Sequence, residues 1–271
     1  MQDSPRSPAA SLVLAATLVS ILAWVSAVAF WADRSVAEES AFRSNALTVM
    51  EMDSSQAALA ARLVDEAVDA LPLLAFVRGA GERAVVVLLD SGAFNPTLER
   101  LVAEGHRHIL SGVAEPFVAD LTDVRAALVA PIAELAPDLA DRIPVDVFQA
   151  VVIFDSGALP VVGRTLRWLP AISVLTAAAA VLVAVAAIVL SRRRSVALFS
   201  VAAGVAFAGL GVAAWSALGG TLASARIEDE LTRALVENGF TVVAPALRVE
   251  GLGLMGAGVI LALAGLVMRS E

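Results

Sequence analysis

Cysteine, lysine and tyrosine are all absent from this sequence of 271 residues. Without cysteine there is no disulfide, no thiolate nucleophile and no cysteine-ligated metal. All 19 basic residues are arginine, which we interpret as the codon bias of a GC-rich genome and not as a sign of phosphate recognition. The net charge of −8 argues against a nucleic-acid partner, because binding a phosphate backbone needs concentrated positive charge.

Charge is missing from four long apolar runs: residues 12–31, 169–190, 196–218 and 251–268. Hydrophobic residues make up 59 % of the chain, against roughly 45–50 % in ordinary soluble domains. Each run has about the 20 residues that a helix needs to cross a hydrocarbon core of ~30 Å, and a helix satisfies its own backbone hydrogen bonds in lipid. The sequence therefore predicts an all-α membrane protein with four transmembrane helices.

The only basic cluster, Arg192, Arg193 and Arg194, lies in the short turn 191–195 between the second and third runs. Short arginine-rich loops stay in the cytoplasm, so these residues are predicted to determine the topology. By alternation the tails 1–11 and 269–271 are cytoplasmic, and the segments 32–168 and 219–250 are exported. The predicted location is the cell membrane, with several passes and a large extracytoplasmic loop.

Trp31, Trp168 and Trp215 fall near the predicted outer ends of the spans, where an amphipathic indole prefers the membrane interface. The first span has one alternative, a cleaved signal peptide, because residues 27–29 (Ala-Val-Ala) have the small-x-small pattern of a cleavage site. The segment 32–168 is exported in both interpretations.

None of the four runs contains an ionisable residue, which argues against a transport or channel pathway. The third and fourth runs are instead rich in glycine. Small residues let helices approach closely in lipid, and we expect them to pack an intramolecular bundle, with a dimer face as the alternative.

The segment 33–168 holds 11 arginines and 20 acidic residues, a net charge of −9, in a mainly helical pattern. One helix is expected after Ser54 and Ser55, and another after the pair Asn95-Pro96. The outer loop is expected to hold a helix at 224–237, with Asn238-Gly239 as its stop signal. Helices are also expected to continue outward from the first span to residue 45 and from residue 156 into the second.

The exported segment contains a possible internal repeat at a shift of 65 residues. The sequence VVLLDSGAF at 86–94 aligns with VVIFDSGAL at 151–159. The two β-rich runs could pair, so the fold class includes a possible two-stranded sheet, although apolar runs this short cannot be distinguished from a buried helix. Ser91 and Ser156 also suit the N-cap of a following helix, which explains the same residues without any catalytic role.

An apolar run followed by Asp-Ser-Gly-Ala resembles the catalytic loops of retroviral and pepsin-like aspartic peptidases. This resemblance implies, as an alternative function, a membrane-anchored aspartic peptidase in which Asp90 and Asp155 share a proton. Phe94 and Leu159 depart from the small or polar residue that those families carry next. The helical pattern around both motifs also departs from their β architecture.

His106 and His108 are the only histidines. On a helix two such rings diverge by about 200°, so the pair is expected to be structural and not a metal site. No phosphate-binding loop, dinucleotide fingerprint or serine-nucleophile motif is present, and the prediction is that the chain has no catalytic, cofactor or metal site.

The layout as a whole resembles uncharacterised multi-pass membrane proteins common in actinobacteria. The features that carry this likeness are Ser91 with Phe94, the histidine helix, Leu169-Pro170, the triple-arginine turn and the glycine-rich third run. It implies no activity. The expected function is a non-enzymatic envelope protein whose exported domain docks a partner or assists assembly of a membrane complex. The expected partners are membrane lipid and another envelope or membrane protein.

Overall fold

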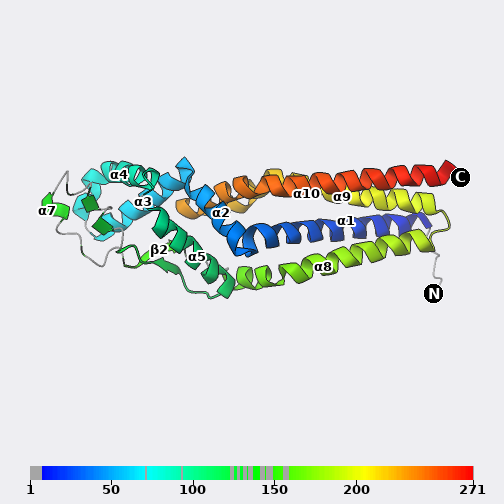
Figure 1. Cartoon of the computed structure of the whole chain (residues 1–271), viewed down its shortest axis with the longest axis horizontal. Helices are drawn as coiled ribbons and strands as arrows, with labels where there is room; N and C mark the ends of the chain where they lie inside the picture. The colour runs from blue at the N-terminus through cyan, green and yellow to red at the C-terminus, as the bar shows by residue number, and fades with distance from the viewer. Residues whose placement is uncertain are drawn as a thin grey trace. The chain divides into compact units, whose positions relative to one another are not determined.

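The structure is a computed structural model, and it describes residues 8–70, 72–92, 94–122, 125–126, 129–130, 133, 137–140, 144, 149–154 and 159–270 (Figure 1). The elements in chain order are α1 (Pro8–Ala32), η1 (Asp33–Ala37), α2 (Glu39–Met50), α3 (Asp53–Ala70), η2 (Pro72–Val77), α4 (Arg78–Asp90), α5 (Asn95–Ser111), β1 (Phe117–Ala119), α7 (Pro137–Ala140), β2 (Val151–Phe154), α8 (Leu159–Leu190), α9 (Arg194–Ser224) and α10 (Glu230–Ser270). The predicted fold class, all-α with a small two-stranded sheet, is confirmed.

Four helices are long and apolar enough to cross a membrane, and they contain the four predicted runs: Ala10–Ala37, Pro160–Leu190, Arg194–Ser224 and Glu230–Arg269. These helices support a multi-pass membrane protein. The last of them, α10, has 41 residues, and at 1.5 Å per residue it is about 60 Å long. Because that exceeds a hydrocarbon core of ~30 Å, a large part of α10 lies outside the lipid.

The chain divides into two compact units. Unit 1 comprises Met1–Val36, Leu166–Gly219 and Val243–Glu271. Unit 2 comprises Ala37–Thr165 and Gly220–Val242. Each is described by itself.

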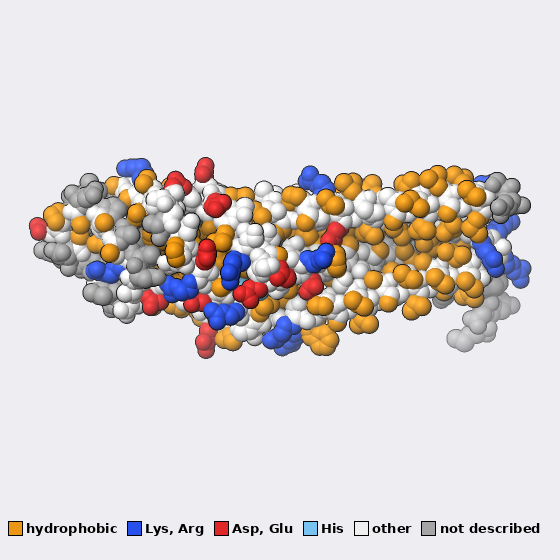
Figure 2. Space-filling model, viewed as in Figure 1, with side chains coloured by type: hydrophobic (Ala, Val, Ile, Leu, Met, Phe, Trp, Pro, Cys, Tyr) orange, Lys and Arg blue, Asp and Glu red, His pale blue; other side chains and the backbone are white. Residues whose placement is uncertain are grey.

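In unit 1, α9 is the most buried of the four long helices, and glycines bring its neighbours close to it. A Cβ atom at Gly204 would lie 2.5 Å from the carbonyl oxygen of Ala16 on α1. On the α10 side, a Cβ at Gly209 would lie 2.5 Å from the Gly251 oxygen. These glycines therefore pack an intramolecular bundle, as predicted. Apolar side chains cover the outside of these helices (Figure 2).

Unit 2 has its own hydrophobic core, in which α3 buries Leu59, Leu63 and Ala67 at the predicted helical spacing. The helix α5 begins at Asn95, with Phe94 at the N-cap position and Pro96 in the first turn, one residue from the prediction. Side chains from α4, β2 and the start of α10 complete the core, among them Val85, Val151 and Leu231.

The repeat does not give two similar structures. Residues 86–90 belong to the helix α4, which buries Val85 and Leu89 one helical turn apart. The β-type interpretation of this copy is wrong, because the polar residues before the apolar run extend it into a helix of 13 residues. Only the second copy forms a strand, β2, and it pairs antiparallel with β1, matching Phe117 to Phe154 and Ala119 to Val151.

Three predicted boundaries need correction. The helix expected at 224–237 is instead the end of α9 and the start of α10, and α10 continues through Asn238-Gly239 without stopping. The first span does not continue as an α-helix to residue 45: a π-helix follows α1, and Glu38 then caps α2. The helix entering the second span begins at Leu159 and continues through Pro170, as expected, whereas residues 155–158 lie outside the described part.

Candidate functional site

The turn between α8 and α9 is held tight by one side chain. The hydroxyl of Ser191 accepts a hydrogen bond from the Arg193 backbone N–H (3.3 Å) and donates one to the Arg193 carbonyl oxygen (3.2 Å). The helix α9 then begins at Arg194, with the Ala197 N–H donating to the Arg193 oxygen. Because the turn is so short, three successive arginine side chains must leave the backbone in different directions.

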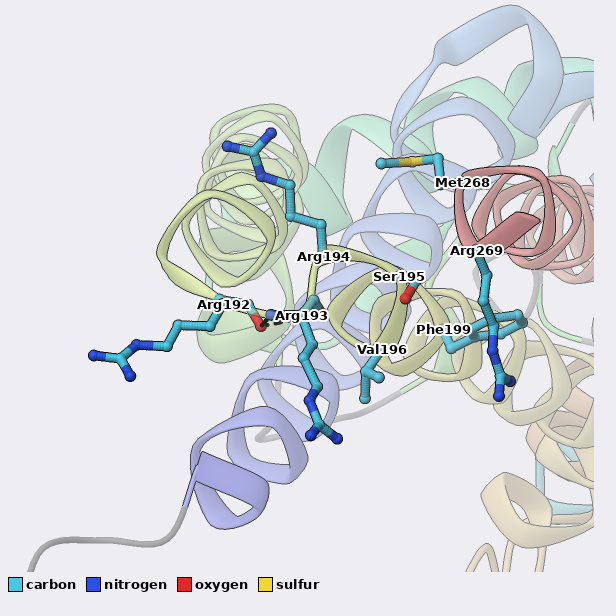
Figure 3. Close-up of a pocket in the computed structure, with 9 residues that line it drawn as sticks. Arg192, Arg193, Arg194, Ser195, Val196, Phe199, Met268 and Arg269 are labelled. Atoms are coloured by element: carbon cyan, nitrogen blue, oxygen red, sulfur yellow. Dashed lines mark hydrogen bonds between the residues drawn. The ribbon is translucent and has the colours of Figure 1, made fainter. Parts of the chain in front are cut away.

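An open hollow of about 810 Å³ lies at this end of unit 1. The α8–α9 turn, the first residues of α9 and the last turn of α10 line it: Ser191, Arg192, Arg193, Arg194, Ser195, Val196, Phe199, Met268 and Arg269. Figure 3 shows the side chains of Arg193 and Arg269 extending toward the same side, with Val196 between them and Phe199 beside Arg269. Arg192 and Arg194 extend away in other directions. We call this feature the arginine hollow.

Among the described residues, the lining of the arginine hollow is positively charged. Two chain segments, 192–194 and 269, contribute its four guanidinium groups. No carboxylate of the described residues lines the hollow. The ion pairs found among the described residues are made by two other arginines, Arg43 and Arg78 of unit 2. Such an arrangement is suited to binding an anion, since a guanidinium presents a fork of N–H donors that matches a carboxylate or a phosphate.

Of the two aspartates proposed as a catalytic pair, only Asp90 is within the described part of the chain. Asp90 is the exposed last residue of α4, so its surroundings are helical and not the strand-and-loop of an aspartic peptidase. Asp155 lies outside the described residues.

The two histidine rings have different neighbours. His106 is 2 % exposed and stacks on Phe42 of α2, with ring centroids 4.5 Å apart. The Nε2 atom of His108 lies 2.8 Å from the Glu115 carbonyl oxygen, and its ring tilts against Phe117. Both rings thus take part in packing within unit 2. Over the described ranges, no group of three or more His, Cys, Asp or Glu side chains is placed to hold a metal ion.

The three tryptophans expected at the membrane interface differ in exposure. Trp168 is 62 % exposed, as an interface residue needs to be. Trp31 is only 7 % exposed, and its indole N–H donates to the carbonyl oxygen of Val243 on α10 (3.0 Å). Trp215 is half-buried and meets Trp24 edge to face, with ring centroids 6.4 Å apart. Trp31 and Trp215 therefore pack within the bundle.

A polar contact missed by the sequence reasoning joins α10 to α3 in unit 2. The side-chain amide of Asn238 donates to the hydroxyls of Ser54 and Ser55, each at 2.7 Å. Ser55 is fully buried, so this amide satisfies a hydroxyl that has no access to water. The pair Asn238-Gly239 was interpreted as a helix stop, and nothing in the sequence reveals a partner more than 180 residues away.

Three carboxylates of unit 2 accept hydrogen bonds from nearby N–H or hydroxyl groups. The Ala41 and Ser40 groups that donate to Glu38 lower the pKa of that carboxyl below its usual value. Hydrogen bonds from Thr122 likewise lower the pKa of Asp120. Partial burial, the largest single cause, raises the pKa of Asp229, but the hydrogen bonds from Thr232 and the charges of Arg62 and Arg233 together lower it below its usual value. Glu38 and Asp229 thus stabilise helix N-termini as anions.

Unit 2 also presents an apolar face on the 3₁₀-helix η2. Residues three apart eclipse each other in a 3₁₀-helix, so Leu73 and Phe76 lie side by side, and they are 57 % and 72 % exposed. Pro72 and Ala75 are exposed as well. We call these four residues the η2 face. Next to it Arg78 forms ion pairs with Asp65 (2.7 Å) and Glu82 (2.9 Å).

Comparisons of the chain with protein-family models, with curated proteins and with solved structures find no match.

Proposed function

We propose that this chain is a non-enzymatic protein of the cell membrane whose extracytoplasmic unit docks another envelope or membrane protein. In this proposal the Arg192–Arg194 turn and both termini are cytoplasmic, unit 2 is outside, and lipid surrounds the four long helices. The docking assists assembly of a membrane complex.

The arginine-rich turn supports the orientation. It is the only basic cluster in a chain with a net charge of −8, and it spans the end of the three-residue connection between α8 and α9 and the first residue of α9. Positive charge in a short loop retains that loop in the cytoplasm. Figure 1 places the start of α1 and the end of α10 next to this turn, so the same argument applies to the two ends of the bundle.

The η2 face is the observation that supports docking. Exposing a phenylalanine and a leucine side by side to water is unfavourable. A partner surface that covers them makes a favourable contribution to the binding free energy of roughly 25 cal/mol per Å² of apolar area buried. Exposed aromatic side chains rimmed by polar residues are typical of protein interfaces. Around the η2 face the segment is acidic, with the exposed Asp69 at the end of α3. A partner with an apolar patch and basic rim fits it best.

Site-specific photo-crosslinking in intact cells tests this function. A photoreactive phenylalanine at position 76 is expected to give one discrete heavier product, and Leu73→Asp in the same chain is expected to abolish it. The matched control is the same photoreactive residue in place of Val118, which is exposed and apolar but lies on β1. Equal products from both positions, or a product at 76 that survives Leu73→Asp, would show that the η2 face is not a docking site.

A further inference from the structure

The arginine hollow combines charge with an apolar wall. Val196 and Met268 line it and are 44 % and 47 % exposed. Phe199 is half-buried and lies beside Arg269 (Figure 3). The place of Phe199 depends on Gly265 of α10, where a Cβ atom would lie 3.3 Å from the ring. The guanidinium groups and the apolar side chains therefore share one surface at the end of the helices.

From this arrangement we propose that the arginine hollow binds the phosphate of an anionic phospholipid. Arg193 and Arg269 hold the phosphate, while Val196, Phe199 and Met268 contact its glycerol and the first carbons of its acyl chains. A guanidinium presents two parallel N–H donors that match two phosphate oxygens. The use of arginine instead of lysine carries no weight in a chain without lysine. The placement of two guanidiniums on the same side, with no ion pair to another described residue, carries the argument.

The apolar side chains of Val196, Phe199 and Met268 favour binding of a phospholipid over binding of a soluble phosphate. A soluble phosphate ester gains nothing from an exposed valine and methionine, whereas a phospholipid carries acyl chains directly beside its phosphate. The hollow also lies at the ends of α8, α9 and α10, where lipid headgroups meet helices that cross the membrane. Basic pockets between transmembrane helices bind anionic headgroups in this way. The inference needs the four helices to span a membrane and does not depend on docking by unit 2.

A specific phosphate site and a diffuse basic surface differ in how lipid affinity changes when single arginines are replaced. If the four arginines only supply charge, each arginine-to-glutamine change weakens lipid binding by the same factor. If the phosphate lies between Arg193 and Arg269, these two changes dominate. The matched control for Arg193→Gln/Arg269→Gln is Arg192→Gln/Arg194→Gln, because it also removes two charges but from side chains that extend away (Figure 3).

Native mass spectrometry of the purified full chain in detergent, with phosphatidylglycerol or phosphatidylcholine added, measures the binding. We expect retention of phosphatidylglycerol over phosphatidylcholine. The variant Arg193→Gln/Arg269→Gln is expected to lose this preference with about a tenfold or larger drop in affinity, whereas Arg192→Gln/Arg194→Gln stays within about twofold of the wild type. Added glycerol phosphate, the soluble arm, is expected not to displace the lipid.

Thermal unfolding of the same samples gives a second readout. Phosphatidylglycerol is expected to raise the melting temperature of the wild type and of Arg192→Gln/Arg194→Gln but not of Arg193→Gln/Arg269→Gln, because a ligand stabilises only a state that binds it. Three results would each overturn the proposal: equal losses for the two double variants, unchanged binding in Arg193→Gln/Arg269→Gln, or displacement by glycerol phosphate at concentrations similar to those of the lipid.

Discussion

Asn238 stabilises unit 2 through two hydrogen bonds of one side-chain amide. Its Nδ2 atom donates to Ser54 and Ser55, and Ser55 is fully buried. Asn238→Ala leaves both hydroxyls without this donor, which costs roughly 1–3 kcal/mol when the group is buried. We therefore predict a lower melting temperature for the purified variant.

The neighbouring residue supplies the control for this prediction. A Cβ atom at Gly239 would meet nothing within 4 Å among the described residues, and Gly239 lies inside α10. Gly239→Ala is expected to stabilise the helix by up to about 1 kcal/mol, because alanine favours helix over glycine. A melting temperature for Asn238→Ala at or above that of the wild type would contradict the role of the amide.

Asp229 makes the stability of unit 2 depend on pH. Its folded pKa lies below the usual 3.8, so the stability it contributes is complete above that value and is lost as pH falls through the folded pKa. Asp229→Asn keeps a side chain able to cap α10 but removes the titration. We predict that the variant melts near the wild-type temperature at pH 7 and loses less stability between pH 5 and about pH 2. Parallel acid profiles of the two proteins would exclude this role of Asp229.

At the scale of elements, the close approach of α9 and α10 depends on the glycines on the side of α10 that faces α9. A Cβ atom at Gly258 would lie 2.8 Å from the Ala202 oxygen and 2.9 Å from the Ala206 nitrogen. Gly258→Ala forces the helices apart, and overpacking of this kind costs roughly 1–3 kcal/mol. We predict a clear fall in thermal stability in detergent.

Gly256, two residues away on the same helix, is the matched control. A Cβ there would have no neighbour within 4 Å among the described residues, so Gly256→Ala is expected to leave stability unchanged or slightly higher. Comparable destabilisation by both substitutions would show that the glycines serve helix flexibility and not the α9–α10 contact.

The four apolar runs were predictable because length and the absence of charge define a membrane span without tertiary information. Boundaries near them were not. The helix α10 passes through Asn238-Gly239 because the amide of Asn238 has distant partners in α3. The α1 helix ends before Glu38 because that carboxylate caps α2 by accepting from Ser40 and Ala41, a role that glutamate seldom has.

Only part of the arginine hollow could be predicted from the sequence. The cluster Arg192–Arg194 is contiguous and could be found at once, whereas Arg269 is 75 residues beyond it and joins it only when α10 packs on α9. For the proposed aspartate pair, the sequence suggested a similarity that the structure does not have. Two similar sequences suggested one repeated structure, but neighbouring polar residues extend the first copy into a helix and tertiary pairing with β1 makes the second a strand.

At the scale of the whole molecule, an even number of membrane spans places both chain ends on one side. The central claim is that this side is the cytoplasm and that residues of unit 2 face the outside. Both statements follow from the Arg192–Arg194 turn through the preference of short basic loops for the cytoplasm. The docking proposal for the η2 face depends on them, because only an exported unit can meet an envelope partner.

Labelling of single cysteines in intact cells tests this claim most directly. The chain has no cysteine of its own, so each variant carries one thiol: Asp120→Cys, Glu230→Cys or Ser195→Cys. A membrane-impermeant maleimide is expected to label positions 120 and 230 in intact cells, and position 195 only after the cells are permeabilised. Labelling of position 195 in intact cells, with positions 120 and 230 protected until permeabilisation, would contradict the proposed orientation.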